Sequence, residues 1–215
     1  MLFATAGAGA QSRREPLADV SARVLSQLFG VPDTLQPLRM SLTDLKRAFP
    51  SLRPLMAGIQ HQIWGARSAD GVEVHFMIAA DATSDAPPAD SVSRVEFLLA
   101  TSNASLFRQV YATITQSIPH VRTPYRCERN TVLREDINLR WVNFAASWQT
   151  EVIGTAFSAV ISHGSTAAIT QSGYAPYRLQ FTTFLRSDLL ITPSELTRTD
   201  AGCPFRPDEL RSRRR

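Results

Sequence analysis

The sequence predicts an α+β protein in which an antiparallel sheet of about seven strands carries N-terminal helices and one long helix on one face. Three observations favour this class. Apolar residues recur every three or four positions near the N-terminus and again over residues 104–118, as in helices that bury one side. Many other apolar residues alternate with polar ones, as in strands with one buried face. The resulting order is helix, helix, three strands, helix and about four strands.

The first helix is expected after Pro16, because proline is favoured in the first turn of a helix. Gly30 and Pro32 are expected to end it. Its apolar residues share one side, which we expect to cover the core: Leu17, Val20, Val24, Leu25 and Leu28.

A second helix is expected over residues 42–49, where Ser41 and Asp44 have the spacing of a capping box. The Ser41 hydroxyl accepts from the amide of residue 44 in such a box, and the Asp44 carboxylate reaches back. Met40 and Leu45 stand where a hydrophobic staple is found. Pro50 and Pro54 end the helix.

Strands and one long helix make up the middle of the chain. Residues 59–64 and 72–78 alternate around a turn at 69–71, which predicts a β-hairpin, and residues 81–90 form a loop. A strand over residues 92–99 then leads to the long helix. Asn103 or Ser105 is expected to cap that helix, and Pro119 to end it.

The second half of the chain is rich in β-branched and aromatic residues. Residues 132–144, 151–162, 166–174 and 177–185 are expected to form consecutive antiparallel strands. We therefore expect a single α+β domain over residues 16–190, with a front half at 16–118 and a β-rich back half at 122–190. Residues 191–215 are expected to be an irregular tail, and no convincing internal repeat is present.

Part of the front half resembles a known family. The capped helix with Phe49 and Pro50, the hairpin closing with Gly71-Val72-Glu73-Val74 and the strand over 92–99 resemble the exported α+β modules of the β-lactamase-inhibitor-protein and SmpA type. The resemblance covers residues 41–99. It implies a non-catalytic binding module of the cell envelope.

Composition argues against two classes of partner. The net charge is +4, but 22 of the 23 basic residues are arginines scattered among 19 acidic ones, so we expect no nucleic-acid partner. Only residues 211–215 form a basic run, as in a solvated tail. No segment approaches the ~20 apolar residues of a membrane-spanning helix, so no integral membrane segment is expected.

The first ten residues and the two cysteines favour export. Residues 1–10 end in Ala8-Gly9-Ala10, which resembles the cleavage end of a signal peptide, although a basic start is missing. Cys127 and Cys203 are widely separated and fit one disulfide that pins the tail. We therefore expect a periplasmic or secreted protein. The alternatives are an Ala/Gly-rich leader on a cytoplasmic protein and two unrelated buried thiols.

No group of residues forms a specific catalytic, metal or cofactor motif. His61 and His75 lie on the two arms of the predicted hairpin and would suit a metal only if they face each other, without an evident third ligand. Ser162 with His163, Cys127 with His120, and Glu135 with Asp136 each lack a fixed geometry, and no glycine-rich phosphate loop is present. We therefore predict no catalytic residue, no metal and no cofactor.

Aromatic residues indicate where a partner would bind, although core packing is their ordinary role. The candidate surface comprises Trp141, Trp148, Tyr174, Tyr177, Arg178 and Gln180. The leading hypothesis is a non-catalytic exported protein that binds another protein. The alternatives are a protein that holds a small apolar ligand between the sheet and the long helix, and an enzyme of an unrecognised family that uses His61 or His75.

Overall fold

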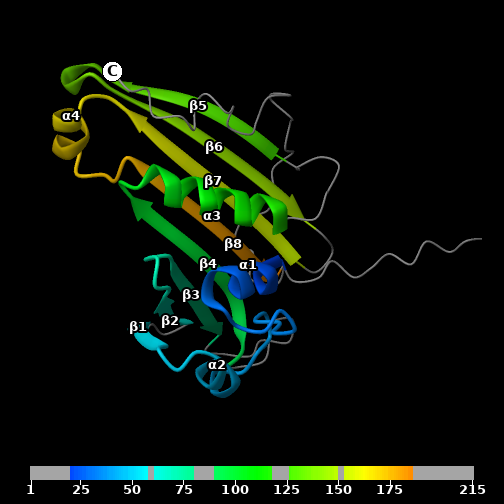
Figure 1. Cartoon of the computed structure of the whole chain (residues 1–215). Helices are drawn as coiled ribbons and strands as arrows, with labels where there is room; N and C mark the ends of the chain where they lie inside the picture. Colours follow the sequence, from blue (N-terminus) through cyan, green and yellow to red (C-terminus); the bar gives the residue numbers. More distant parts are fainter. Residues whose placement is uncertain (1–19, 58–60, 80–89, 118–125, 150–152, 186–215) are drawn as a thin grey trace, which may run out of the picture.

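The computed structural model describes residues 20–57, 61–79, 90–117, 126–149 and 153–185, which form helices and one eight-stranded antiparallel sheet. The sheet has the order β1-β2-β3-β4-β8-β7-β6-β5 (Figure 1). The α+β prediction is therefore confirmed, with eight strands instead of about seven. The strands are β1 (Arg53–Ala57), β2 (His61–Arg67), β3 (Glu73–Ala79), β4 (Val92–Thr101), β5 (Arg126–Arg134), β6 (Leu139–Gln149), β7 (Ile153–His163) and β8 (Tyr177–Leu185).

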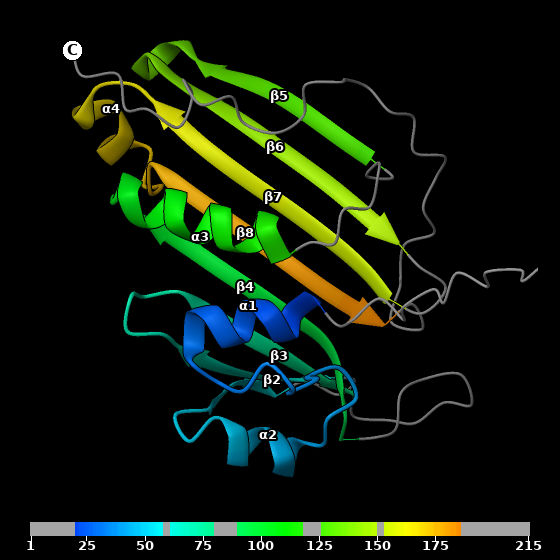
Figure 2. The ribbon, with the colours of Figure 1, turned by 45° about the vertical axis from the view of Figure 1, so that its right-hand side comes forward.

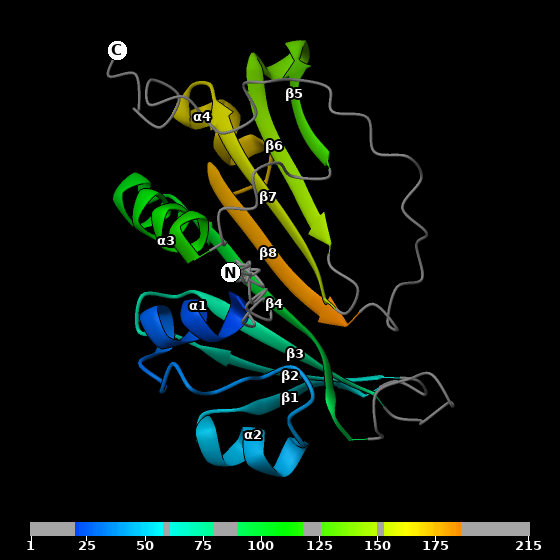
Figure 3. The ribbon, with the colours of Figure 1, turned by 90° about the vertical axis from the view of Figure 1, so that its right-hand side faces the viewer.

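Three helices cover one face of this sheet (Figures 2 and 3). They are α1 (Val20–Phe29), α2 (Leu42–Ala48) and α3 (Ala104–Ser117). A fourth helix, α4 (Thr166–Gln171), connects β7 to β8 at one end of the sheet (Figure 1). None of the helices in the described ranges is long and apolar enough to cross a membrane.

Burial alternates along the central strands, as the sequence predicts for a sheet covered on one side. In β4, Val95, Phe97 and Leu99 are at most 4% exposed, whereas Glu96 and Leu98 between them are half-buried. In β8, Leu179 and Phe181 are buried beneath α3 in the same way. We call the side that faces the helices the covered face and the opposite side the open face.

The long helix α3 packs tightly on the covered face. Phe107, Val110 and Ile114 are each at most 1% exposed, and Phe107 lies 5.3 Å from the ring of Tyr177 between centroids. Tyr111, one turn further along α3, lies 5.6 Å from the ring of Phe157 on β7. Large side chains thus fill the space between α3 and the sheet.

The predicted helix starts are confirmed by their hydrogen bonds. The backbone N–H of Asp44 donates to the Ser41 hydroxyl at 3.1 Å, and that hydroxyl donates to the Asp44 carboxylate at 2.8 Å. At the start of α3, Asn103 Oδ1 accepts from the backbone N–H groups of Ser105 and Leu106. Asn103, and not Ser105, is therefore the N-cap. The end of α1 at Gly30 is also as predicted, since Gly30 has φ +68°.

Two predictions for the back half are wrong. Residues 132–144 do not form one strand, because a 3-10 turn (Glu135–Ile137) divides them between β5 and β6. Asn138 follows that turn in the left-handed region, which asparagine tolerates better than most residues. Residues 166–174 are not a strand either: Ser165 accepts a hydrogen bond from the backbone N–H of Ala168 and starts α4.

Two features of the sheet were not predicted: strand β1, and the symmetric arrangement of the strands in two halves. Strand β1 is fully exposed at the edge of the sheet, where a buried pattern is absent. The strand order is symmetric about the β4–β8 pair. Strands β1 to β4 form one four-stranded half and β5 to β8 the other, and each half runs from an edge of the sheet to its centre. Each half is preceded by a helix, α1 or α3, and these two helices lie side by side over the central strands (Figures 2 and 3).

Candidate functional site

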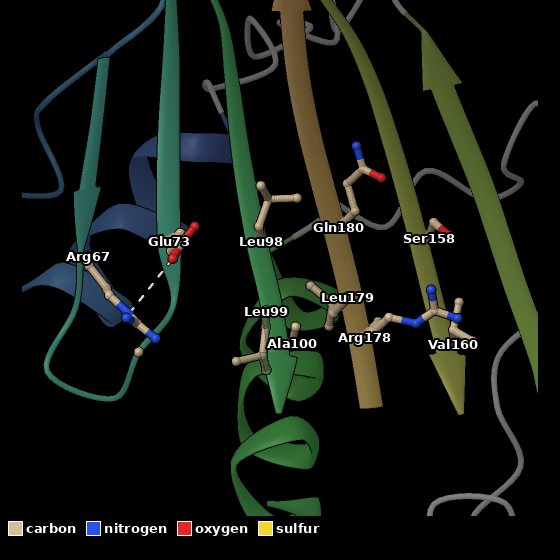
Figure 4. Close-up of a pocket in the computed structure, with 11 residues that line it drawn as sticks. Arg67, Glu73, Leu98, Leu99, Ala100, Ser158, Val160, Arg178, Leu179 and Gln180 are labelled. Carbon is tan, nitrogen blue, oxygen red and sulfur yellow. Dashed lines mark ion pairs between the residues drawn. The ribbon is translucent and has the colours of Figure 1, made fainter. Parts of the chain in front are cut away.

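The open face carries a hollow of about 610 Å³ over the central strands (Figure 4). Its walls come from β2, β3, β4, β7 and β8, which lie far apart in the sequence. The side chains that line it on the open face are Arg67, Glu73, Leu98, Ala100, Ser158, Val160, Arg178 and Gln180.

The register of the strands explains why the surface is hollowed there. Ala100 of β4, Arg178 of β8 and Val160 of β7 form one row across the sheet, and Leu98, Gln180 and Ser158 form the next. Alanine and serine rise little above the backbone, so they leave space between the longer side chains around them. The hollow is therefore a consequence of small residues at the register positions flanking the seam between the two halves.

Arg178 belongs to an aromatic cluster at one end of the hollow. Its guanidinium carbon lies 4.6 Å from the centroid of the Tyr174 ring, and that ring stands edge-on to Trp141 at 6.3 Å. Tyr174 is 53% exposed, which is high for an aromatic side chain of this size. We call Trp141, Tyr174 and Arg178 the aromatic–arginine cluster.

Several buried polar atoms at this end have no hydrogen-bond partner among the described residues. They are Nε of Arg178, Nε1 of Trp141 and the hydroxyl oxygen of Ser162. Buried donors and acceptors in folded proteins are normally paired with protein or with ordered water. These three atoms lie beneath the surface of the aromatic–arginine cluster.

A histidine lies between two carboxylates on the same face, and one of these carboxylates, Glu73, also lines the hollow. His75 Nδ1 is 3.8 Å from Glu96 Oε2, and His75 Nε2 is 3.6 Å from Glu73 Oε2. Glu96, more than Glu73, raises the pKa of His75, against the opposing effect of burial. The imidazole and the Gln180 amide, which donates to Glu96, lower the pKa of Glu96. His75 therefore links Glu73 and Glu96 in one polar network.

The structure brings together four of the six predicted surface residues. Trp141, Tyr174, Arg178 and Gln180 all lie on or beside the open face. Tyr177 does not join them, because it points to the covered face and packs on Phe107. The side chain of Trp148 and the whole of Cys203 lie outside the described residues, as does His120, so the disulfide stays a prediction.

The histidines that the sequence singled out do not meet. His61 is the register partner of Ala79 and His75 that of Gly65, so the two imidazoles share a face but stand four residues apart, about 13 Å along the strand. Within the described ranges, no group of three or more His, Cys, Asp or Glu side chains is placed to hold a metal ion. Ser162 and His163 are consecutive in β7 and therefore point to opposite faces.

Sequence reasoning missed Glu96, Glu73 and Ser158 as members of this surface. No local motif marks them, because β4 and β8 pair residues that lie 76 to 90 positions apart in the chain, from Thr101 with Tyr177 to Arg94 with Phe184. The one available signal was the alternation of β4 and β8, which assigns even-numbered residues of each strand to the less buried face.

Among the described residues, this arrangement offers groups that can bind another molecule. The aromatic–arginine cluster presents a cation and an exposed ring. The network around His75 presents the carboxylates Glu73 and Glu96, and the walls of the hollow are partly apolar. Such a surface can recognise a partner by stacking, charge and shape. No protein-family model matches the chain, and no similar protein was found among curated proteins or solved structures.

Proposed function

We propose that this chain is a non-catalytic binding protein that engages a protein partner through the open face of its sheet. The observation that carries the proposal is the aromatic–arginine cluster of Trp141, Tyr174 and Arg178 beside a hollow of about 610 Å³. Binding hot spots are enriched in tryptophan, tyrosine and arginine, and here all three meet at one place.

The difference between the two faces of the sheet supports this role. The covered face is filled by α1, α2, α3 and the aromatic core, so its side chains serve stability. On the open face, Leu98 and Arg178 are half-buried and Gln180 is exposed, so these side chains can contact another molecule. A sheet whose other face is packed against helices holds its surface side chains in fixed positions, and this limits the conformational entropy that is lost on binding.

A protein partner fits this surface better than a small apolar ligand. The space between α3 and the sheet, where the alternative hypothesis places such a ligand, is occupied by Phe107, Val110 and Ile114. The hollow lies on the other face and mixes charged and apolar walls. A surface of this kind suits the side chains of a protein loop, which carry both characters.

We further propose that the protein acts outside the cytoplasm with Cys127 and Cys203 joined in a disulfide. The residues that support this are the small-residue pattern at 8–10 and the even number of cysteines. The role agrees with what the resemblance to β-lactamase-inhibitor-protein and SmpA-type modules implies. Free thiols together with a cytoplasmic location in fractionation would contradict it.

Site-specific photo-cross-linking tests the proposed binding face. A benzoylphenylalanine placed at Tyr174 lies on the cluster, and one placed at Gln109 lies on the exposed side of α3. In cells that produce the chain, we expect a discrete cross-linked protein from position 174 and not from position 109. A Trp141→Ala change should suppress the cross-link at 174 without altering the circular dichroism of the protein.

Two results would contradict the proposal. One is an equal set of cross-linked species from positions 174 and 109, which would show that contact is not specific to the open face. The other is an undiminished cross-link in Trp141→Ala, which would show that the cluster contributes nothing to binding. Leu133→Ala provides a matched control, because Leu133 is an exposed apolar residue, 61% accessible, outside the hollow.

A further inference from the structure

We propose that Arg178 and the hollow recognise a carboxylate next to an apolar side chain, that is, an aspartate or glutamate of the protein partner flanked by an aliphatic or aromatic residue. The inference rests on the proposed function and specifies the chemistry of its partner. Three features of the open face carry it: the distribution of charges among the described residues, the position of Arg178 over the Tyr174 ring and the apolar wall beside it.

Among the described residues, the carboxylates of the open face pair with other groups, and none of them is a counter-ion of Arg178. Glu73 is shared by Arg67 at 3.9 Å and His75 at 3.6 Å (Figure 4). Glu96 faces His75 and accepts a hydrogen bond from Gln180. Arg178, in contrast, forms no ion pair with any carboxylate in the described part of the chain. Among the described residues that line the hollow, Arg178 is therefore a cation that no carboxylate neutralises.

The guanidinium of Arg178 is also held ready to bind. Its guanidinium carbon lies 4.6 Å from the centroid of the Tyr174 ring, and the Arg178 side chain is only half-buried. A planar guanidinium donates two parallel hydrogen bonds to one carboxylate, and a stacked guanidinium loses little freedom when it does so. A carboxylate is the acceptor that satisfies both the charge and the fork of donors.

The walls beside Arg178 require that the carboxylate be carried on an apolar segment. Val160 and Ala100 are its register partners on the two flanking strands, and Leu98 lines the same hollow (Figure 4). A volume of about 610 Å³ holds more than a single carboxylate. An acidic residue next to a leucine or an aromatic residue fills both parts of the hollow.

The test is an NMR titration of the full chain, labelled with nitrogen-15, with two capped tripeptides. Acetyl-Leu-Glu-Leu-amide carries the carboxylate, and acetyl-Leu-Gln-Leu-amide has the same shape without the charge. We expect the glutamate peptide to bind about tenfold more tightly or better, as followed by the Arg178 Nε–H and Trp141 Nε1–H resonances. In Arg178→Gln the two peptides should bind equally weakly. Arg140→Gln, at an exposed arginine on β6, two strands away from β8, should retain the preference.

Three outcomes would overturn the inference: equal binding of both peptides to the unmodified chain, a preference for glutamate that survives in Arg178→Gln, or binding of free hexanoate without binding of the glutamate peptide. The last outcome would assign the hollow to small acids instead of a protein partner. The cross-linking at Tyr174 is independent of this result. A negative peptide titration with a specific cross-link at Tyr174 would contradict the inferred carboxylate recognition and leave the proposed binding face supported. Loss of specific cross-linking at Tyr174 would contradict the proposed binding face itself.

Discussion

The ring of Phe184 lies over Gly154, its register partner on the neighbouring strand, on the open face of the sheet. A Cβ atom added at position 154 would overlap the phenyl ring. The Arg94 guanidinium lies 5.9 Å from the centroid of the same ring. Gly154 is therefore the residue that lets an aromatic side chain lie flat on this part of the sheet.

We expect Gly154→Ala to destabilise the fold by about 1–3 kcal/mol, because the added methyl group must displace the Phe184 ring. An alanine in place of glycine ordinarily favours a strand by roughly 0.5–1 kcal/mol, so the sign itself is informative. Urea unfolding followed by circular dichroism measures the change. Ser158→Ala on the same strand serves as the neutral control.

A double-mutant cycle separates the ring from other causes. In a Phe184→Ala background the overlap is gone, so Gly154→Ala should become neutral or stabilising. Destabilisation of the same size in that background would show that the backbone of β7, and not Phe184, requires the glycine.

The pH dependence of stability should carry the signature of His75 and Glu96. The pKa of His75 is raised above its ordinary 6.5, so its contribution is present below that value and is lost as the pH rises through the folded pKa. The pKa of Glu96 is lowered below its ordinary 4.5, so its contribution is present above that value and is lost as the pH falls through the folded pKa. Both contributions are complete between about pH 4.5 and 6.5.

We therefore expect His75→Gln to cost most stability between those pH values and little at pH 9. The difference should stay below about 1 kcal/mol, because the pair is partly accessible to water. Urea unfolding at pH 5.5 and 9 measures it. His61→Gln on the same hairpin is the control, and a loss in His75→Gln that is identical at both pH values would contradict the ionic interpretation.

The start of α2 depends on a single hydroxyl group. Ser41 Oγ accepts from the backbone N–H of Asp44 at 3.1 Å, so Ser41→Ala leaves that amide without its partner. We expect a loss of about 1 kcal/mol in the free energy of unfolding. Thr43→Ala, at an exposed position in the same turn, should change it by less than about 0.5 kcal/mol. Equal losses in the two variants would argue against the capping role.

The core beneath α3 should be the most sensitive part of the fold. Ile114 is fully buried against the sheet, and Ile114→Ala should cost about 2–5 kcal/mol through lost burial and a new cavity. The exposed neighbour Gln116 provides the matched control on the same helix. A loss below about 1 kcal/mol at Ile114 would mean that α3 packs more loosely than the contacts with β7 and β8 indicate.

The predicted disulfide has a direct test. We expect the mature protein to be lighter by two hydrogen atoms under non-reducing conditions and, if the leader is removed, to begin at Gln11. A bridge between Cys127 and Cys203 closes a long loop and should contribute about 4 kcal/mol. Cys127→Ser combined with Cys203→Ser should show that loss. An unchanged mass after reduction would rule the bridge out.

Local patterns predicted most of the elements correctly. The helix caps at Ser41 and Asn103, the stop at Gly30 and the hairpin around Gly71 depend on neighbours a few residues away, so the sequence contains the information. Predictions failed where context overrides propensity. The threonine and isoleucine of α4 favour strands, yet Ser165 caps a helix there, and exposed β1 has no buried pattern to reveal it.

The sequence by itself determined the fold class and, on β8, the face that carries Arg178 and Gln180, because alternation along one strand assigns residues to faces. It did not determine which strand lies beside β8, since the pairing with β4 joins the two halves of the chain. Only the tertiary structure placed His75 between two carboxylates and Arg178 over the Tyr174 ring, with no carboxylate paired to Arg178 among the described residues. Such relationships depend on register between distant strands, which no local pattern encodes.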